Sequence, residues 1–169
     1  MADHEVTITE WMDAEVDEGI VLRICASPAG VRTIEFEPAA AERDPSPRNS
    51  LLRETAAQLR AYFAGRRRDF DLPLVLQGTD FQLRVWRQLL TIPFGETRSY
   101  SFVAQAIGRP AAVRAVGSAN GANPIPIVVP CHRVIGVNGK LVGYGGGLPL
   151  KKRLLALEQI EQTMLWPPR

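Results

Sequence analysis

The segment IVVPCHRVIG, residues 127–136, holds the pair of residues best suited to chemistry in this chain of 169 residues. Cys131 follows a proline, precedes His132, and lies between two apolar runs. A cysteine reacts as a thiolate, and a free thiol with a pKa of about 8.5 is mostly protonated at neutral pH, so a nearby base raises its reactivity. The other interpretation is a small core residue beside a basic neighbour. This segment alone leaves both interpretations open.

His132 is the only histidine in the second half of the chain and is the candidate base. Neighbouring residues of a regular strand point to opposite faces, so the chain must turn at Pro130 or a water must bridge the two side chains. A histidine base is commonly oriented by a third group, often a carboxylate. Glu158 is the candidate, because it lies four residues after Leu154 and shares the apolar face of the last helix. The spacing fits a buried, partnered carboxylate and also a carboxylate at the helix edge that reaches water.

The first part of the chain reads as strands followed by a helix. Three short runs rich in β-branched residues predict an antiparallel meander at 6–14, 19–26 and 30–38. Pro, Ser, Asp and Asn predict a loop at 39–50, and apolar residues at helical spacing predict a helix over 50–64. A basic turn and a short strand then lead to residue 78. Cys25, in the second run, is expected to be a small buried hydrophobe.

The second part of the chain reads as mostly helical. Thr79 and Gln82 form a capping box in front of a helix in which Trp86 belongs to the core. A final helix is expected from about Pro149. These patterns predict an N-terminal sheet subdomain, 1–77, and a C-terminal domain, 78–169.

Between these helices the sequence predicts a helix-turn-helix. Ser99 can cap a helix that runs to about Ile107, Gly108 fits its C-terminal cap, and Pro110 fits the first position of the next helix. The second helix carries small residues around Arg114, which indicates either a tight core contact or a close approach to a partner. An unpaired buried guanidinium is costly, so Arg114 favours the second interpretation.

Composition and charge narrow the class of protein. Residues 1–78 hold 9 Lys/Arg and 14 Asp/Glu, a net charge of −5, and residues 79–169 hold 11 and 4, a net charge of +7. A basic half fits a polyanionic partner or plain solvated surface. Two cysteines and two histidines leave no ligand set for structural zinc, and no long apolar run or secretion signal is present, so we expect a cytoplasmic protein without metal. A cysteine hydrolase would explain the Cys-His-Glu set and a transcription regulator the helix-turn-helix, but neither explains both.

A set of motifs in fixed order resembles one family. FQLRVW, IPFGETRSY, AVRAVGSANGANP, VVPCHRVIG, GYGGG and LLALE, between about residues 78 and 158, are similar to the O6-alkylguanine-DNA alkyltransferases, also called methylated-DNA–protein-cysteine methyltransferases. Residues 1–77 match in outline the ribonuclease-H-like N-terminal subdomain of that family. The resemblance implies an α/β (α+β) fold, with a small antiparallel sheet and helix before a mostly helical domain with a helix-turn-helix.

The resemblance also implies a reaction, direct-reversal DNA repair. The protein would bind duplex DNA, flip an O6-alkylguanine, and also an O4-alkylthymine, out through the minor groove, and move the alkyl group irreversibly onto Cys131. Each molecule would act once. The expected partner is double-stranded DNA carrying O6-alkylguanine, bound by a monomer without cofactor or membrane; cooperative binding along DNA stays open. In the cell the protein would be cytoplasmic, and nucleoid-associated when bound to DNA.

The resemblance assigns roles residue by residue. His132 would be the base through a water, oriented by Glu158, and Asn123 would brace the active-site turn. The base pocket would use the hydroxyl of Tyr100, the amide of Gly145, the carbonyls of Cys131 and Val134, and the side chain of Tyr144. Arg114 would fill the space left by the flipped base, and the remaining DNA-binding residues would be Tyr100, Ser99, Ala112, Val113 and Gly117.

Two further points depend on the resemblance. Gly145–Gly147 is all glycine where some relatives carry a larger residue, so we expect the pocket to accept alkyl groups larger than methyl. The alternatives are a lesion-binding protein of the alkyltransferase-like type, which Cys131 opposes because that type lacks the acceptor cysteine, and the cysteine hydrolase.

Overall fold

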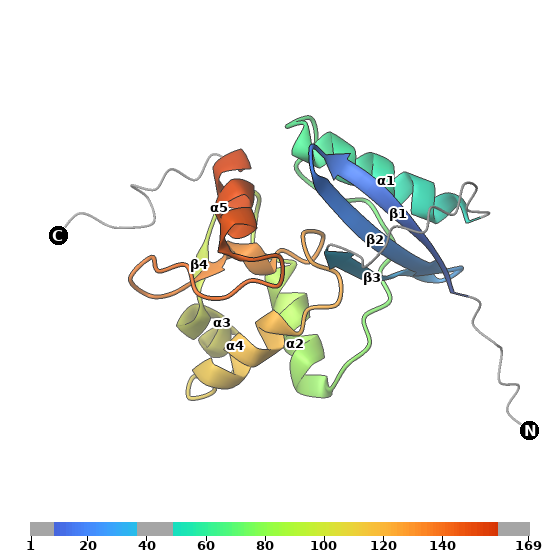
Figure 1. The fold of residues 1–169 in the computed structure, drawn as a ribbon. Coiled ribbons are helices and arrows are strands. Elements are labelled where there is room, and N and C mark those ends of the chain that lie inside the picture. The colour runs from blue at the N-terminus through green and yellow to red at the C-terminus, as the bar shows by residue number, and fades with distance from the viewer. Residues whose placement is uncertain (1–8, 37–48, 159–169) are drawn as a thin grey trace, which may run out of the picture. The chain divides into compact units, whose positions relative to one another are not determined.

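The structure is a computed structural model that describes residues 9–36 and 49–158. The chain divides into two compact units, Met1–Leu76 and Gln77–Arg169 (Figure 1). The first residues of the expected strand at 6–14, most of the expected loop at 39–50, and the segment 159–169 lie outside the described residues.

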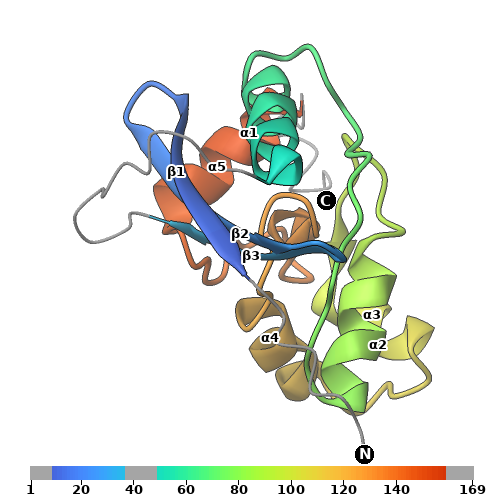
Figure 2. The same cartoon turned by 90° about the vertical axis from the view of Figure 1, so that its right-hand side faces the viewer.

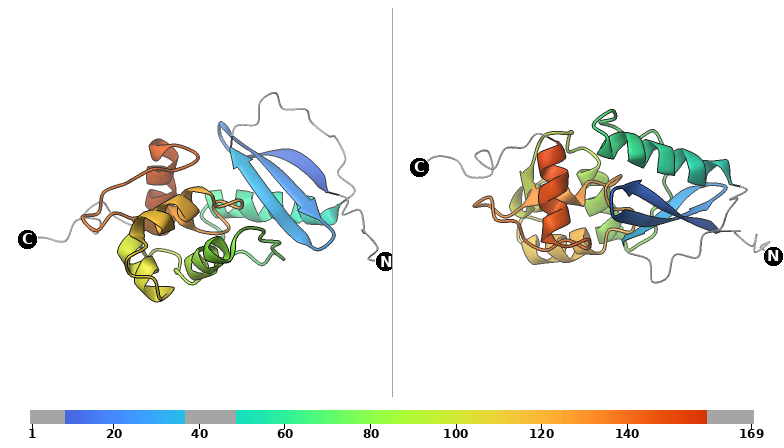
Figure 3. Two further views of the ribbon diagram at one scale, coloured as in Figure 1. Left: turned by 90° about the horizontal axis from the view of Figure 1, so that it is seen from below. Right: turned by 45° about the horizontal axis from the view of Figure 1, so that its top comes forward.

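The first unit contains a three-stranded antiparallel sheet. Strands β1 (Glu10–Asp17), β2 (Ile20–Ser27) and β3 (Gly30–Phe36) pair in the order β1-β2-β3, which confirms the predicted meander. Helix α1 (Ser50–Phe63) lies along one face of this sheet (Figure 3), as the apolar spacing predicted. Alternate strand residues pack against it, as expected for a period of two: Ala14, Val16, Leu22, Ile24, Ala26 and Ile34.

The predicted strand after α1 is wrong. It is reduced to one parallel bridge between Val31 and Leu74, with Val31 N donating to Pro73 O at 2.8 Å and Val75 N donating to Val31 O at 2.9 Å. The backbones at Gly30 and Pro73 are so close that a Cβ on Gly30 would lie 2.6 Å from Pro73 O. Pro73 has no N–H to donate, so the pairing cannot extend on the N-terminal side of this bridge.

The sheet face opposite α1 carries polar side chains. Arg23 forms a bidentate ion pair with Asp13 at 2.8 and 2.9 Å, and its guanidinium lies 4.3 Å from the ring centre of Trp11. Cys25, paired with Trp11 in the register, lies on this face and is only partly buried. The expectation of a buried Cys25 is therefore wrong, because strand alternation places it away from α1.

The second unit is mostly helical. Helices α2 (Asp80–Leu89), α3 (Tyr100–Ala106) and α4 (Val113–Gly121) pack against one another (Figure 2), and α5 (Leu148–Leu157) follows the segment that holds Cys131. The capping box at Thr79 and Gln82 is present at 2.9 and 3.2 Å. Trp86 is buried, and its Nε1 donates to Ala119 O at 2.8 Å, which confirms it as core and ties α2 to α4.

The helix-turn-helix consists of α3 and α4. Ser99 Oγ accepts from Phe102 N at 3.0 Å as the predicted cap, and Gly108, with φ of 72°, ends the first helix. The second helix begins later than predicted. Ala112 N donates to Arg109 O at 2.9 Å, so residues 109–112 form a turn and α4 starts at Val113. Pro110 takes the second position of this turn, where its fixed φ is favourable, rather than the first position of the helix.

Candidate active site

The reactive segment turns immediately before Cys131. Asn123 Nδ2 donates to Val129 O at 2.8 Å, and Asn123 Oδ1 accepts from Ile125 N at 3.0 Å. These bonds cross a bend in which Ile127 has a φ of 74°, unusual for a β-branched residue. Residues 127 and 128 form a turn, and residues Cys131–Arg133 form a single 3₁₀ turn, η1. The amide of Asn123 therefore holds together the loop that presents the thiol.

A two-residue parallel pair places this turn beside the helix-turn-helix. Strand β5 (Val134–Ile135), directly after η1, pairs with β4 (Arg98–Ser99), directly before α3. The start of α3 and the thiol segment are thus neighbours although more than 30 residues separate them.

His132, Arg133 and Glu158 form a buried network. His132 Nε2 lies 2.8 Å from Glu158 Oε1, and Arg133 donates from Nε to Oε2 at 2.9 Å and from Nη2 to Oε1 at 3.0 Å. Arg133 Nη1 donates to Ile92 O at 2.6 Å, and Gly95 N donates to Glu158 Oε2 at 3.3 Å. Glu158 is 2% exposed, so it does not reach water from the edge of α5. It caps the C-terminus of that helix and turns inward.

The network fixes the protonation of its members. Burial alone raises the pKa of Glu158, but the hydrogen bonds and charges of His132 and Arg133 outweigh it and lower the pKa to about 2. Burial lowers the pKa of His132 despite its bond to Glu158. The carboxylate is therefore ionised and the imidazole neutral near pH 7, with the proton on Nε2 and Nδ1 left as an acceptor. Nδ1 has no hydrogen-bond partner among the described residues.

Cys131 is poised as a thiol rather than as a resting thiolate. It is 5% exposed, and burial raises its pKa, although the amide of Asn123 and the positive charge of Lys151 act in the opposite direction. A buried thiol with a raised pKa needs a base to take its proton before it can react. His132, neutral and with a bare Nδ1, is chemically suited to that task.

Lys151 closes the other side of the site. It is fully buried, and its Nζ donates to Val134 O at 2.8 Å and to Val142 O at 3.2 Å. Burial lowers its pKa to about 8. The hydroxyl of Tyr100 donates to the same Val142 O at 3.2 Å, and burial raises the pKa of this phenol. The loop after β5 is therefore tied to β5, α3 and α5.

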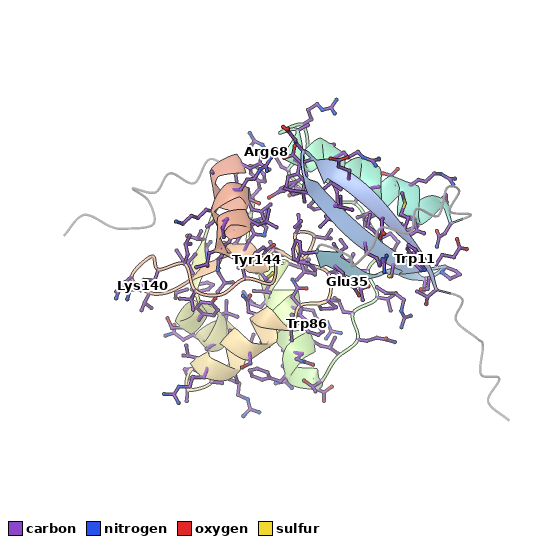
Figure 4. The ribbon with its side chains drawn as sticks, in the orientation of Figure 1. Trp11, Glu35, Arg68, Trp86, Lys140 and Tyr144 are labelled. Atoms are coloured by element: carbon purple, nitrogen blue, oxygen red, sulfur yellow. The ribbon has the colours of Figure 1, made fainter. Side chains whose placement is uncertain are left out.

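The expected base-pocket residues lie around this loop. Tyr144, half-buried, belongs to the loop between β5 and α5, and Lys140 lies at its outer tip (Figure 4). Gly145 is exposed. The carbonyl of Val134 already accepts from Lys151, and the carbonyl of Cys131 accepts from Val134 N and, at 3.4 Å, from Asn120 Nδ2.

The expected DNA-binding residues lie on the helix-turn-helix. Arg114 is exposed in the first turn of α4, Val113 beside it is 38% exposed, and Ala112 is the residue before the helix. Gly117, one turn later, is partly buried. Ser99 uses its hydroxyl as the cap of α3. No hydrogen bond or ion pair in the described residues joins Arg114 to the Cys131 network.

Three residues of the site were missed from the sequence: Arg133, Lys151 and Asn120. Lys151 carried the same signal as Glu158, since it lies three and four residues before Leu154 and Leu155 on the buried face of α5. A charge in the apolar segment was the signal for Arg133. Asn120 gave none, because asparagine near a helix end is commonly exposed.

The described residues contain no helix long and apolar enough to cross a membrane. In the same part of the chain, no group of three or more His, Cys, Asp or Glu could hold a metal ion.

Comparison with known proteins decides the family. Residues 80–160 match the DNA-binding domain of 6-O-methylguanine DNA methyltransferase, and residues 21–76 match its ribonuclease-like domain. The methylated-DNA–protein-cysteine methyltransferase of Mycobacterium tuberculosis strain H37Rv is 57% identical over 124 residues, 73% of this chain and 74% of that protein. This chain belongs to the methylated-DNA–protein-cysteine methyltransferase family. A relative from Methanosarcina barkeri with the same name is 58% identical over 109 residues, 64% of this chain and 69% of its own.

Solved structures of the methyltransferase family agree with this fold. The crystal structure of Mycobacterium tuberculosis O6-methylguanine methyltransferase has a TM-score of 0.79 and 45% identity, and the match covers 90% of this chain and 93% of the other. A structure of the Mycobacterium tuberculosis protein in complex with DNA has a TM-score of 0.76 and 44% identity, over 93% and 98% of the two chains. The predicted family, mixed α/β fold and enzyme class are confirmed, and the activity is DNA alkyl repair.

Proposed function

We propose that this methyltransferase moves an alkyl group from the O6 atom of guanine in duplex DNA to Cys131 Sγ, irreversibly and once per molecule. O4-alkylthymine is the second substrate. The observation that carries the proposal is the buried pair of Cys131 and neutral His132, held by an ionised Glu158 with a His132 Nε2 to Glu158 Oε1 distance of 2.8 Å.

The step balances as one displacement. The proton of Cys131 Sγ passes through a water to His132 Nδ1, Sγ forms a bond to the alkyl carbon, and the bond from that carbon to O6 breaks. The electron pair stays on the base, where a hydrogen-bond donor stabilises the developing charge. Tyr100 and the amide of Gly145 are the proposed donors. Tyr100 donates to Val142 O here, so base entry requires its hydroxyl to change acceptor.

Recognition of guanine would use carbonyls that already have partners. Val134 O accepts from Lys151, and Cys131 O accepts from Val134 N and Asn120 Nδ2. A carbonyl oxygen has two lone pairs, so Val134 O can accept one further bond from the exocyclic amine of the base. Cys131 O would have to exchange a partner. Tyr144 would complete the pocket.

DNA would be bound by the helix-turn-helix through the minor groove. Ala112, Val113 and Gly117 are small enough for close approach, Ser99 and Tyr100 begin the preceding helix, and Arg114 is exposed and able to enter the space left by the flipped base. Flipping costs a few kcal/mol, which an inserted side chain offsets. The solved structure of the Mycobacterium tuberculosis relative in complex with DNA supports DNA as the partner.

We also propose the domain boundary, the oligomeric state, the location in the cell and the range of alkyl groups. The boundary between the sheet subdomain and the DNA-binding domain lies at residues 77 and 78, with the first part serving as a scaffold. The protein acts as a monomer in the cytoplasm, on the nucleoid when bound to DNA. The run Gly145–Gly147 lets the pocket take alkyl groups larger than methyl, so similar rates on methylated and benzylated guanine are expected, and strict methyl preference would contradict this point.

The test is the intact mass of the protein after incubation with a duplex that contains one O6-methylguanine. The expected result is a gain of one methylene, abolished by Cys131→Ser and retained by Cys25→Ser. Demethylation with turnover and no change of mass would indicate a hydrolase. Binding without any transfer would indicate a lesion-binding protein.

A further inference from the structure

Asn120 is a buried polar residue that the reaction described above does not use. It lies near the end of α4 and is 6% exposed, and the other buried residues of that helix are apolar, Val116 and Ala119. Its Nδ2 donates to Cys131 O at 3.4 Å, a long hydrogen bond to the residue that carries the thiol. Its Oδ1 has no hydrogen-bond partner among the described residues.

A buried amide oxygen without a partner is costly and calls for an explanation. Native proteins commonly pair such an acceptor with an ordered water. His132 Nδ1 is a second buried acceptor without a partner in the described part of the chain. Both groups contact the peptide between Cys131 and His132. His132 is part of that peptide, and Asn120 donates a hydrogen bond to its oxygen, Cys131 O.

The proton relay needs an acceptor at this place. A water between Cys131 and His132 accepts from the thiol and donates one hydrogen to Nδ1, so its other hydrogen still needs an acceptor. A buried water typically makes about three hydrogen bonds, and one with a free hydrogen is poorly oriented. Asn120 Oδ1 is the unpaired acceptor whose side chain already contacts the Cys131 peptide.

We propose that Asn120 is a positioning residue whose Oδ1 accepts the second hydrogen of the relay water, so that the water is fixed between Cys131 and His132. The proposal rests on the proposed function. Asn120 takes no proton itself: the thiol proton goes to the water and a water proton goes to His132 Nδ1. Asn120 and Arg114 both lie on α4, so this helix would contribute to the deprotonation of Cys131 as well as to DNA binding.

Four charged or titratable groups lie around His132 and Cys131 in the described structure. Glu158 and Arg133 contact His132 or each other, and Lys151 and Tyr100 lie close enough to Cys131 to influence its ionisation or be influenced by it. None of these groups is changed by a substitution of Asn120. A change in the pH profile of such a variant therefore reports on the relay water.

The experiment measures single-turnover rates of Cys131 alkylation by free O6-benzylguanine against pH, in a Cys25→Ser background. Three variants are compared. Asn120→Leu keeps the shape and removes both polar atoms, Asn120→Gln keeps a neutral amide with the same donor and acceptor, and Val116→Ala weakens the packing of α4 without touching the relay. General bases contribute roughly 10²–10⁴-fold, so loss of a well-placed water should slow the reaction by roughly 10-fold or more at neutral pH.

The expected pattern is specific. Asn120→Leu should be slow at neutral pH and approach the wild-type rate at high pH, where the thiol loses its proton without the relay. Asn120→Gln should react faster than Asn120→Leu at neutral pH, and Val116→Ala should lower stability but keep the wild-type profile. Equal slowing of Asn120→Leu at every pH, or the same rate at neutral pH for Asn120→Gln and Asn120→Leu, would overturn the proposal.

A crystal structure of the wild-type protein supplies the second readout, which does not depend on whether the variants fold. It should show a water within hydrogen-bond distance of both Asn120 Oδ1 and His132 Nδ1. A water that contacts His132 but not Asn120 would refute the positioning role. A wild-type protein that gains no methyl group on Cys131 from duplex DNA containing O6-methylguanine would instead refute the proposed function.

Discussion

Replacement of Glu158 by glutamine removes one negative charge from a buried site that holds a guanidinium. In the structure the side chain of Glu158 is fully buried, that of Arg133 is 7% exposed, and two hydrogen bonds of 2.9 and 3.0 Å join them. The substituted amide could donate or accept, but it could not neutralise Arg133. The positive charge would stay buried with only neutral acceptors, Ile92 O among them.

Two routes give the size of the effect. The pKa of Glu158 falls from its ordinary 4.5 to about 2, which corresponds to about 3 kcal/mol of stability at neutral pH. Breaking a buried ion pair by removing one partner costs roughly 3–5 kcal/mol. Because the folded pKa lies below the unfolded one, this stability is complete above pH 4.5 and is lost as the pH falls toward 2. Glu158→Gln should therefore lose about 3 kcal/mol at pH 7 and less than half as much at pH 3.

The assay is urea unfolding at pH 7 and pH 3, followed by the fluorescence of Trp86 with the other two tryptophans replaced by phenylalanine. Trp86 is buried in the core of the second unit and reports on it. The matched control is Glu96→Gln, which removes an ion pair to Arg98 at 2.6 Å whose carboxylate is 50% exposed. Such a pair contributes about 0–1 kcal/mol. A loss below about 1 kcal/mol for Glu158→Gln at pH 7, or the same loss at both pH values, would refute the reasoning.

Three further changes have expected outcomes. Burial lowers the pKa of Lys151 to about 8, so the free energy of unfolding of the wild type relative to Lys151→Met should rise by about 3 kcal/mol between pH 8 and 10.5. This difference is measured by urea titrations at a series of pH values. A difference that does not change with pH would contradict the burial of a cation. Arg114→Ala should slow transfer from duplex DNA more than reaction with free O6-benzylguanine, in parallel single-turnover assays; equal losses would remove its role in flipping. Asn123→Ala should destabilise the second unit by roughly 2 kcal/mol in urea unfolding, because Val129 O and Ile125 N lose their partner; an unchanged midpoint would show that the bend holds itself.

Most of the fold could be predicted from the sequence, because the local signals for strands and helix starts agree with the tertiary structure. Strand alternation placed β1 to β3, and the capping box at Thr79 and the serine cap at Ser99 placed two helix starts. The start of α4 was misplaced because Pro110 fits a turn as well as a helix. The predicted strand near Leu74 is only one bridge, because an apolar run does not show whether a neighbouring strand can pair with it.

The site could be predicted only in part. A motif beside a proline indicated Cys131 and His132, and helix spacing allowed two environments for Glu158. The choice between them depended on Arg133, which reaches the carboxylate only because η1 turns the chain. Lys151 and Asn120 act through backbone carbonyls, Val134 O and Cys131 O, and side-chain periodicity contains no information about those atoms.

The central claim is that Cys131 is a reagent consumed by one transfer and made ready by His132. The most direct measurement is peptide mass mapping after the protein reacts with an excess of duplex DNA containing O6-methylguanine. One methyl group per protein molecule, on the peptide with Cys131, is the predicted result. A methyl group on Cys25, or repaired DNA in excess of the protein, would contradict it.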